Sequence, residues 1–263
     1  MKPQSKAFSH SDTATTSSSA PTTVMESQAK DISSEEDLPD YLVRYYRWAY
    51  LWRFAVWFFD HQPIINMILF GNYRRIMDCT TQLIEPEKAG TMLQIAAVYG
   101  ELTQNLAQQV DDLHVIDIAP VQLEKLEGKL NRTQTQAQLA RMNAEALEYE
   151  DNSFDTSLMF LLLHEMPPEA RRNSLREALR VLRPGGRFVL AEYGEIRQNH
   201  FIHRFPPLRW TLTFSEPFLD GFWKEDLVEV VYRCGEEVGK EVVLIEQKDI
   251  FGGFYRVLAF EVR

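Results

Sequence analysis

From residue 91 onward, short apolar runs alternate with amphipathic segments. Apolar runs predict strands at 91–96, 113–118, 138–142, 154–162 and 187–192, and the segments between them predict helices. The fourth run is almost unbroken, which is typical of a strand buried on both faces. Two further runs, 241–248 and 255–262, flank a Phe-Gly-Gly-Phe turn and predict a terminal β-hairpin. The alternation therefore predicts an α/β fold with a doubly wound, mostly parallel, seven-stranded sheet.

The region before residue 89 does not follow this alternation. Residues 1–37 are rich in Ser and Thr and poor in apolar side chains, which predicts disorder. A mitochondrial transit peptide is an alternative, but this stretch contains no Arg. Residues 38–88 predict a helical extension with one helix over 40–60 and a second from Pro63 to about Glu85. Residues 89–263 then form the main domain, in which 194–223 interrupts the alternation as a cap insertion.

Aromatic side chains occupy nearly the whole circumference of the predicted helix 40–60, interrupted by Arg44, Arg47 and Arg53. The arginines make the segment too polar to span a bilayer. Aromatic rings interleaved with Arg suit a membrane interface or the wall of a pocket for a flat apolar ligand. A packing helix that covers the main domain is the alternative.

Charge and cysteine content restrict the function. The chain has 28 basic and 38 acidic residues, a net charge of −10, which argues against nucleic acid as a partner because phosphates need Lys and Arg. Its two cysteines, Cys79 and Cys234, lie far apart and fit no metal-binding spacing. They indicate a reducing compartment.

Residues 91–101 predict a strand, a tight turn and the start of a helix. In nucleotide-binding α/β folds, backbone N–H groups of this turn meet the ligand, and an acid at the end of the next strand binds the ribose hydroxyls. Asp117 occupies the place of that acid. Only Gly100 remains of the expected glycines, since Ala96 and Val98 stand where others are usual.

Several motifs together resemble a class I S-adenosylmethionine (SAM)-dependent methyltransferase with its Rossmann-like fold. They are Asp117, Asn143-Ala-Glu145, Asn152-Ser-Phe-Asp155 and Leu182-Arg-Pro-Gly-Gly-Arg-Phe-Val-Leu190. Within this superfamily the chain resembles the quinone methyltransferase-like group, and five segments resemble the RquA-type rhodoquinone biosynthesis enzymes. The segments that carry this resemblance are Trp48-Ala-Tyr-Leu, Ile68-Leu-Phe-Gly-Asn-Tyr73, Leu93-Gln-Ile-Ala-Ala-Val-Tyr-Gly100, Phe160-Leu-Leu-Leu-His-Glu165 and Glu216-Pro-Phe218.

The resemblance implies that ubiquinone is converted to rhodoquinone by replacing a ring methoxy group with an amine. SAM is then the amino donor, and a divalent metal such as manganese assists. One departure concerns the acid-Tyr-His that often follows the fifth strand in that family, because this chain has Glu192-Tyr193-Gly194.

The resemblance implies two sets of site residues. The predicted SAM contacts are Gln94, Ala96, Tyr99, Gly100, Asp117, Ile118, Asn143, Ala144, Glu145 and Phe160. The predicted catalytic residues are His164, Glu165, Tyr193 and Gln94, of which His164 and Glu165 are also candidate metal ligands. Both follow the fourth strand, at the edge where open α/β sheets bind ligands. A capping loop before Met166-Pro-Pro168 is the structural alternative for this pair.

Gln94 stands where ordinary methyltransferases have an acid near the amino end of SAM. Removing a carboxylate lowers the pKa of a nearby amine, and only the unprotonated amine is a nucleophile. Gln94 therefore fits amine transfer better than methyl transfer. Drift in a chain that no longer binds SAM would also account for the change.

Three functions remain open from the sequence. The first is SAM-dependent amine transfer to ubiquinone at a membrane surface, with the enzyme bound peripherally. The second is a conventional methyltransferase on a quinone or phenol, and the third is a non-catalytic SAM-fold assembly or lipid-binding factor. For the first, we expect the cytoplasmic face of the inner membrane in a bacterium, or the matrix side of the mitochondrial inner membrane in a eukaryote.

Overall fold

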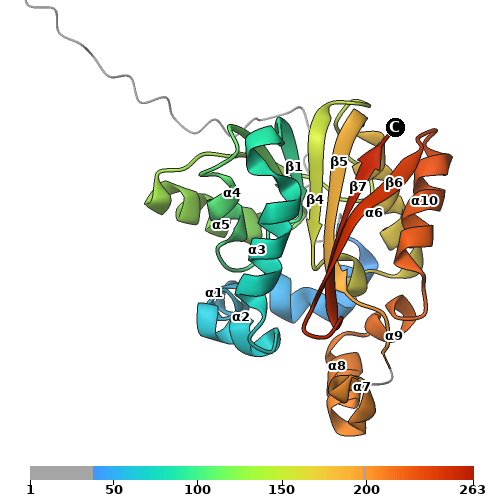
Figure 1. Cartoon of the computed structure of the whole chain (residues 1–263). Helices are drawn as coiled ribbons and strands as arrows, with labels where there is room; N and C mark the ends of the chain where they lie inside the picture. Colours follow the sequence, from blue (N-terminus) through green and yellow to red (C-terminus); the bar gives the residue numbers. More distant parts are fainter. Residues whose placement is uncertain (1–37, 198–199) are drawn as a thin grey trace, which may run out of the picture.

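The computed structural model describes residues 38–197 and 200–263. The segment 1–37, predicted to be disordered, lies outside the described residues. The described chain forms one seven-stranded sheet in the order β3-β2-β1-β4-β5-β7-β6 (Figure 1). The strands are β1 (Thr91–Ile95), β2 (Asp112–Asp117), β3 (Gln138–Arg141), β4 (Phe154–Phe160), β5 (Leu182–Tyr193), β6 (Val242–Ile250) and β7 (Tyr255–Val262).

The first five strands run parallel, and β7 enters antiparallel between β5 and β6. The turn between β6 and β7 is the Phe251-Gly-Gly-Phe254 segment that predicted a hairpin. The sheet confirms the predicted doubly wound α/β fold. It is the Rossmann-like methyltransferase fold, in which the antiparallel pair closes one end of a parallel sheet.

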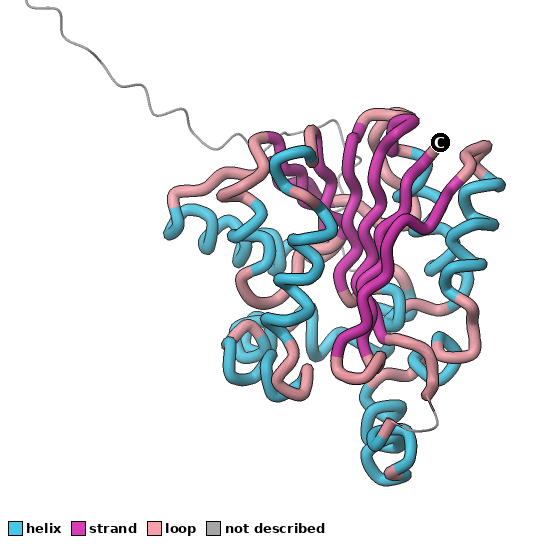
Figure 2. The backbone as a smooth tube through the Cα atoms, viewed as in Figure 1, coloured by secondary structure: helices cyan, strands magenta, loops and turns pink. Residues whose placement is uncertain are grey.

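Helices cover both faces of the sheet (Figure 2). One group comprises α3 (Tyr73–Ile84), α4 (Leu102–Leu106) and α5 (Pro120–Thr133); the other comprises α6 (Pro168–Arg180) and α10 (Leu227–Glu237). Figure 1 shows the two groups on opposite sides of the strands. In β4 every residue except Asp155 is buried, as expected for a strand covered on both faces.

The helical extension is more broken than the sequence predicted. The expected helix 40–60 is divided into η2 (Leu42–Leu51) and α1 (Arg53–Phe59), because Trp52 between them has an extended backbone, with φ −89° and ψ 117°. The expected second helix is divided into α2 (Gln62–Ile68) and α3, where Phe70 and Gly71 both have positive φ. A residue with positive φ cannot continue a right-handed helix.

The helix after β1 is short and ends at Leu106. Helix α10 begins at Leu227, because the Asp226 side chain accepts the N–H groups of Val228 and Glu229 as an N-cap. The cap insertion holds α7 (Phe201–Arg204), α8 (Pro206–Ser215) and α9 (Leu219–Phe222).

Among the residues that the structure describes, none of the helices combines the length and the apolar character needed to cross a bilayer.

Candidate functional site

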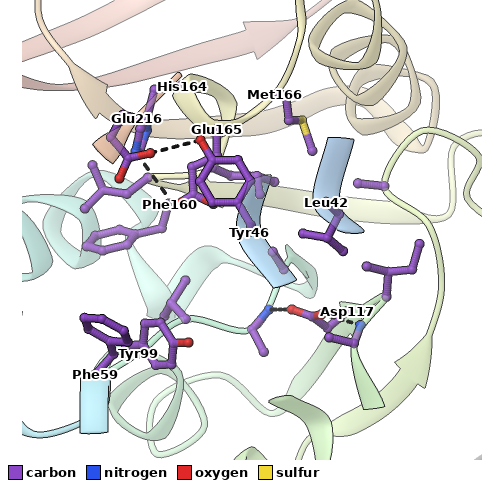
Figure 3. A pocket seen from close by; sticks show the side chains of 18 of the residues that line it. Leu42, Tyr46, Phe59, Tyr99, Asp117, Phe160, His164, Glu165, Met166 and Glu216 are labelled. Carbon is purple, nitrogen blue, oxygen red and sulfur yellow. Dashed lines mark hydrogen bonds and ion pairs between the residues drawn. The ribbon is translucent and has the colours of Figure 1, made fainter. Parts of the chain in front are cut away.

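A cavity of about 360 Å³ lies at the carboxyl ends of the parallel strands. The extension closes it through η2 and the cap through the residues after α8, so its walls come from segments far apart in the sequence (Figure 3). Most of the lining is apolar or aromatic, with a few polar side chains. Among the lining residues are Tyr41, Tyr46, Phe59, Ala96, Tyr99, Asp117, Asn143, Phe160, His164, Glu165, Tyr193 and Glu216.

Asp117 is the last residue of β2 and forms one polar end of this cavity. Its carboxylate accepts backbone N–H groups from Ala97 at 2.9 Å and Ala119 at 2.7 Å. Burial raises the pKa of Asp117 to about 6, although these N–H groups and that of Ile118 act in the opposite direction. The turn after β1 thus fixes a carboxylate that can still accept hydroxyl groups from a ligand.

Gln94 lies beneath this turn and does not line the cavity. Its side chain is fully buried, and Nε2 donates to the carbonyl oxygen of Ala96 at 2.9 Å. Ala96 has φ 71°, an unusual value for a residue with a Cβ atom. Gln94 therefore supports a strained turn, which differs from the expectation that it faces the amino group of SAM.

Gly100 is also held from behind rather than exposed to the cavity. Its N–H donates to Asp60 at the end of α1, and its carbonyl oxygen accepts from Lys129 at 2.8 Å. Gly100 has φ 89°, and a Cβ atom there would collide with the hydroxyl of Tyr73. That hydroxyl accepts the N–H groups of Glu101 at 2.7 Å and Leu102 at 3.2 Å. The extension therefore anchors the turn that the sequence assigned to SAM.

The other predicted SAM contacts divide into two groups. Ala96, Tyr99, Ile118, Asn143, Ala144 and Phe160 line the cavity. Glu145 does not; its carboxylate accepts a hydrogen bond from Asn173 of α6 at 3.1 Å. The Tyr99 hydroxyl accepts from Gln122 at 3.0 Å, which fixes its ring beside Phe59.

The opposite polar end of the cavity is built around His164, in the short η4 (Leu163–Glu165) after β4. Its Nδ1 lies 2.9 Å from the carboxylate of Glu192, which is completely buried in β5. The same carboxylate accepts N–H groups from Leu163 at 2.6 Å and Tyr193 at 3.1 Å. Glu192 thus fixes the imidazole so that Nε2 points away from it, toward Glu165 at 3.9 Å.

His164, Glu165 and Glu216 each place a nitrogen or oxygen ligand atom within 4.8 Å of the others. Glu216 follows α8 in the cap and accepts a hydrogen bond from the Tyr46 hydroxyl of η2 at 3.0 Å. Figure 3 shows Glu216 and Tyr46 meeting beside His164, across the cavity from Asp117. One imidazole and two carboxylates suit a hard or borderline cation such as Mn²⁺. The Glu192 contact on Nδ1 is the usual second partner of a metal-ligating histidine, so these residues fit a divalent metal.

The electrostatics of this cluster follow from its burial. Burial lowers the pKa of His164, but the adjacent Glu192 outweighs it and raises that pKa to about 9. Burial raises the pKa of Glu216, against the effect of His164. Burial raises the pKa of Tyr193, whose ring packs edge-on against His164 with centroids 4.6 Å apart. Tyr193 is therefore a neutral wall residue at physiological pH.

Gly194 explains the missing histidine of the related motif. A Cβ atom at this position would collide with the carbonyl oxygen of Gly253 in the β6–β7 turn. The cap residue His200 instead lies against that turn, with Nε2 2.9 Å from the carbonyl oxygen of Phe251. His200 does not line the cavity.

The roles of Tyr46, Glu192 and Glu216 in the site were not predicted from the sequence. Glu192 stands there only as the acid of the Glu192-Tyr193-Gly194 motif after the fifth strand, and Glu216 only as part of a resembling segment. The hydrogen bond between Tyr46 and Glu216 joins residues 170 positions apart, a pairing that no local pattern signals. An acid within an otherwise apolar strand was the available sign for Glu192.

Comparison with known proteins agrees with the geometry. Residues 92–186 match the family model described as a methyltransferase domain. The chain is similar to the ubiquinone/menaquinone biosynthesis C-methyltransferase UbiE of Zymomonas mobilis, with 27% identity over 140 residues, covering 52% of this chain and 57% of that protein. It is 26% identical to the demethylmenaquinone methyltransferase of Bacillus licheniformis, covering 64% of this chain and 75% of the relative.

A solved structure of a SAM-dependent methyltransferase from Aquifex aeolicus has the same fold. It matches with a TM-score of 0.52 at 14% identity, over 81% of this chain and 98% of that one. The match to the Zymomonas protein spans little more than half the length of each protein. Together, these matches support a SAM-dependent methyltransferase domain related to quinone C-methyltransferases.

Proposed function

We propose that this protein is a SAM-using transferase that acts on ubiquinone and replaces a ring methoxy group by an amine, as RquA-type enzymes do. The observation that carries the proposal is the cavity with two polar ends. Asp117 lies at one end, and His164, Glu165 and Glu216 lie at the other. An apolar, aromatic lining between them suits a flat quinone ring.

Asp117 would bind the ribose hydroxyls of SAM through charge-assisted hydrogen bonds. The turn residues Ala96 to Tyr99 would contact the methionine part, because they line the cavity beside Asp117. Gln94, buried beneath that turn, is a neutral amide at the position where ordinary methyltransferases have an acid, so it adds no negative charge that would hold the amino group as ammonium. This absence favours the unprotonated amine, as transfer of that group requires.

His164, Glu165 and Glu216 would hold a divalent metal, and manganese suits this set of ligands. When bound, the metal would draw electron density from a quinone carbonyl and make the ring susceptible to addition of the amine, with the methoxy group leaving as methanol. Transfer of the α-hydrogen of the methionine part to the ring, which reduces the quinone to the quinol, and hydrolysis of the resulting C=N bond would then release the aminoquinol and a 2-oxo acid. Glu192 keeps Nε2 of His164 directed into the site. Tyr46 keeps the Glu216 carboxylate at the same place, and either Glu165 or Glu216 lies where it could accept the proton that the amine loses.

Ubiquinone resides in the bilayer, so the proposal includes peripheral association with a membrane surface. The exposed rings of α1 support it, because aromatic side chains with Arg favour the headgroup level. The compartment would be the cytoplasmic face of a bacterial inner membrane or the matrix face of a mitochondrial one.

A conventional C-methyltransferase is the second candidate, and the named relatives favour it. The mass of the product separates the two, since exchange of methoxy for amine lowers the mass of the quinone and methylation raises it. The experiment uses purified protein with SAM, a short-chain ubiquinone and manganese.

Variants connect that result to the site. We expect His164→Ala and Glu216→Gln to abolish formation of the amine, and Glu169→Gln, an exposed residue of α6, to leave it unchanged. A methylated quinone, or full activity of both cavity variants, would contradict the proposal.

A further inference from the structure

With one exception, the exposed aromatic and large aliphatic side chains of the described chain lie in two segments. Of the twelve such residues in the described chain, all except Ile245 lie within 45–68 or 201–214. The extension patch comprises Trp52, Phe54, Trp57, Phe58, Met67 and Ile68, and the cap patch comprises Phe201, Phe205, Trp210 and Phe214. Single exposed apolar residues are ordinary on protein surfaces, but gathered sets mark interaction sites.

The cap patch is built as an exposed helical face. None of the residues in α8 is buried. Trp210 and Phe214, one turn apart, stack with ring centroids 5.4 Å apart and are 66% and 75% exposed. The extension patch has the same construction, because Phe54 and Phe58 of α1 stack at 6.4 Å and Phe54 is 72% exposed.

Both patches lie at one end of the molecule. Figure 1 shows α1, α2, α7 and α8 at the end where β4 and β5 finish. Each patch adjoins the cavity, since its lining includes Ile68 of the extension patch and Ser215, which follows Phe214 of the cap patch. A ligand that enters the cavity at this end therefore passes between two apolar patches.

The charges near the patches differ from those of the rest of the chain. Residues 41–59 and 196–215 contain no Asp or Glu and three arginines each, whereas the whole chain has a net charge of −10. Arg53, Arg197 and Arg209 form ion pairs with acids of other segments, whereas Arg44 and Arg204 are exposed beside the rings. An exposed basic side chain therefore accompanies the exposed rings in each of the two segments, the combination that favours an anionic lipid surface.

We propose that the extension patch and the cap patch together form a two-part docking face for an anionic lipid bilayer, with the mouth of the cavity between them. The cap patch is the new element, since it adds a second contact to the association through the extension. Two contacts fix the orientation of the molecule, whereas one would leave it free to tilt. This inference rests on the proposed function only because it assumes that the substrate resides in the bilayer.

The test is sedimentation with vesicles of phosphatidylcholine alone or mixed with phosphatidylglycerol. The cap variant combines Phe205→Ser, Trp210→Ser and Phe214→Ser. The extension variant combines Phe54→Ser, Trp57→Ser and Met67→Ser. The control variant is Ile245→Ser on β6, an exposed aliphatic residue outside both patches. We expect binding to mixed vesicles to weaken on the order of tenfold in each triple variant and to be retained in the control. Binding of the unaltered protein should be weaker to phosphatidylcholine alone, and high salt should reduce the difference.

SAM affinity, measured by calorimetry, should be unchanged in both triple variants, which shows that they remain folded. Vesicle binding by the cap variant equal to that of the unaltered protein would overturn the inference. So would sedimentation velocity showing a dimer that the cap variant dissociates, since the patch would then be an interface between two copies of the chain. If the unaltered protein does not transfer the amine to a short-chain ubiquinone, the proposed function is wrong. The vesicle-binding result would be unaffected by that outcome.

Discussion

At the scale of single residues, two acids determine the chemistry of the two ends of the cavity, half-buried Asp117 and fully buried Glu192. Asp117 accepts backbone N–H groups and still faces the cavity, whereas Glu192 is completely enclosed and acts on His164. The first is placed to bind a ligand and the second to orient a side chain. Their pKa values shift in opposite directions. Burial raises the pKa of Asp117, whereas at Glu192 burial is outweighed by the adjacent His164 and by backbone N–H groups, so that its pKa is lowered.

SAM binding should depend on the ionisation of Asp117. In the protein without ligand, the pKa of the Asp117 carboxyl group is about 6, and the ribose hydroxyls bind the ionised form of this group. The affinity for SAM should therefore fall as the pH decreases through 6, and it should be constant well above pH 6. Calorimetry between about pH 5 and about pH 8 would show the slope. In Asp117→Asn the slope should disappear, and affinity should drop by about 1.5–3 kcal/mol. An unchanged affinity in this variant would place SAM elsewhere.

The Glu192–His164 pair should make stability depend on pH. The folded-state pKa of His164 is about 9, above its usual value of 6.5, so the folded protein holds a proton that the unfolded chain releases. The stabilisation is complete below 6.5 and is lost as pH rises through 9; its size is on the order of a few kcal/mol. Urea unfolding of protein treated with a chelator should show this decline in the unaltered protein. The same decline in Glu192→Gln would show that the pair is not its cause.

At the scale of elements, the extension acts as a support for the turn after β1. The Tyr73 hydroxyl at the start of α3 accepts two backbone N–H groups, and Asp60 at the end of α1 accepts a third and pairs with Lys125 and Lys129 of α5. The turn keeps only Gly100 of the usual glycines and contains a strained Ala96. External hydrogen bonds therefore replace the conformational freedom that glycines would provide.

Tyr73→Phe should test this support. The change keeps the ring but leaves the N–H groups of Glu101 and Leu102 without their acceptor, which should destabilise the fold by about 1–3 kcal/mol. SAM affinity should weaken as well, because the turn loses its anchor. Tyr149→Phe is the matched control, since its hydroxyl makes only a 3.5 Å contact with His114. Equal unfolding midpoints for the two variants would contradict the supporting role.

The sequence predicted the main sheet better than it predicted the extension, and the reason is physical. Parallel strands such as β4 are buried on both faces, so an unbroken apolar run marks them directly. Aromatic residues on all sides of residues 41–59 give no face that a helical period could reveal, and the break at Trp52 was therefore not predicted. The break at Phe70 and Gly71 depends on backbone conformation that glycine permits but does not require.

At the scale of the whole molecule, the candidate site joins three regions that lie far apart in the sequence: the extension, the main domain and the cap. His164 and Glu165 could be predicted because they follow a strand at the ligand-binding edge of the sheet. Glu216 could not, because it reaches the cluster only when the cap and η2 close over the cavity and Tyr46 meets it. Gln94 was assigned to the cavity from its place in a motif, whereas the fold buries it under the turn.

The proposed function requires that the amino group of SAM, rather than its methyl group, is transferred to the quinone. SAM that carries heavy nitrogen in its amino group and heavy carbon in its methyl group distinguishes the two outcomes in one reaction with short-chain ubiquinone and manganese. We predict a product that contains the heavy nitrogen and has lost one methoxy group, with none of the methyl label added to the ring. A quinone that gains the heavy methyl carbon and no heavy nitrogen would contradict it.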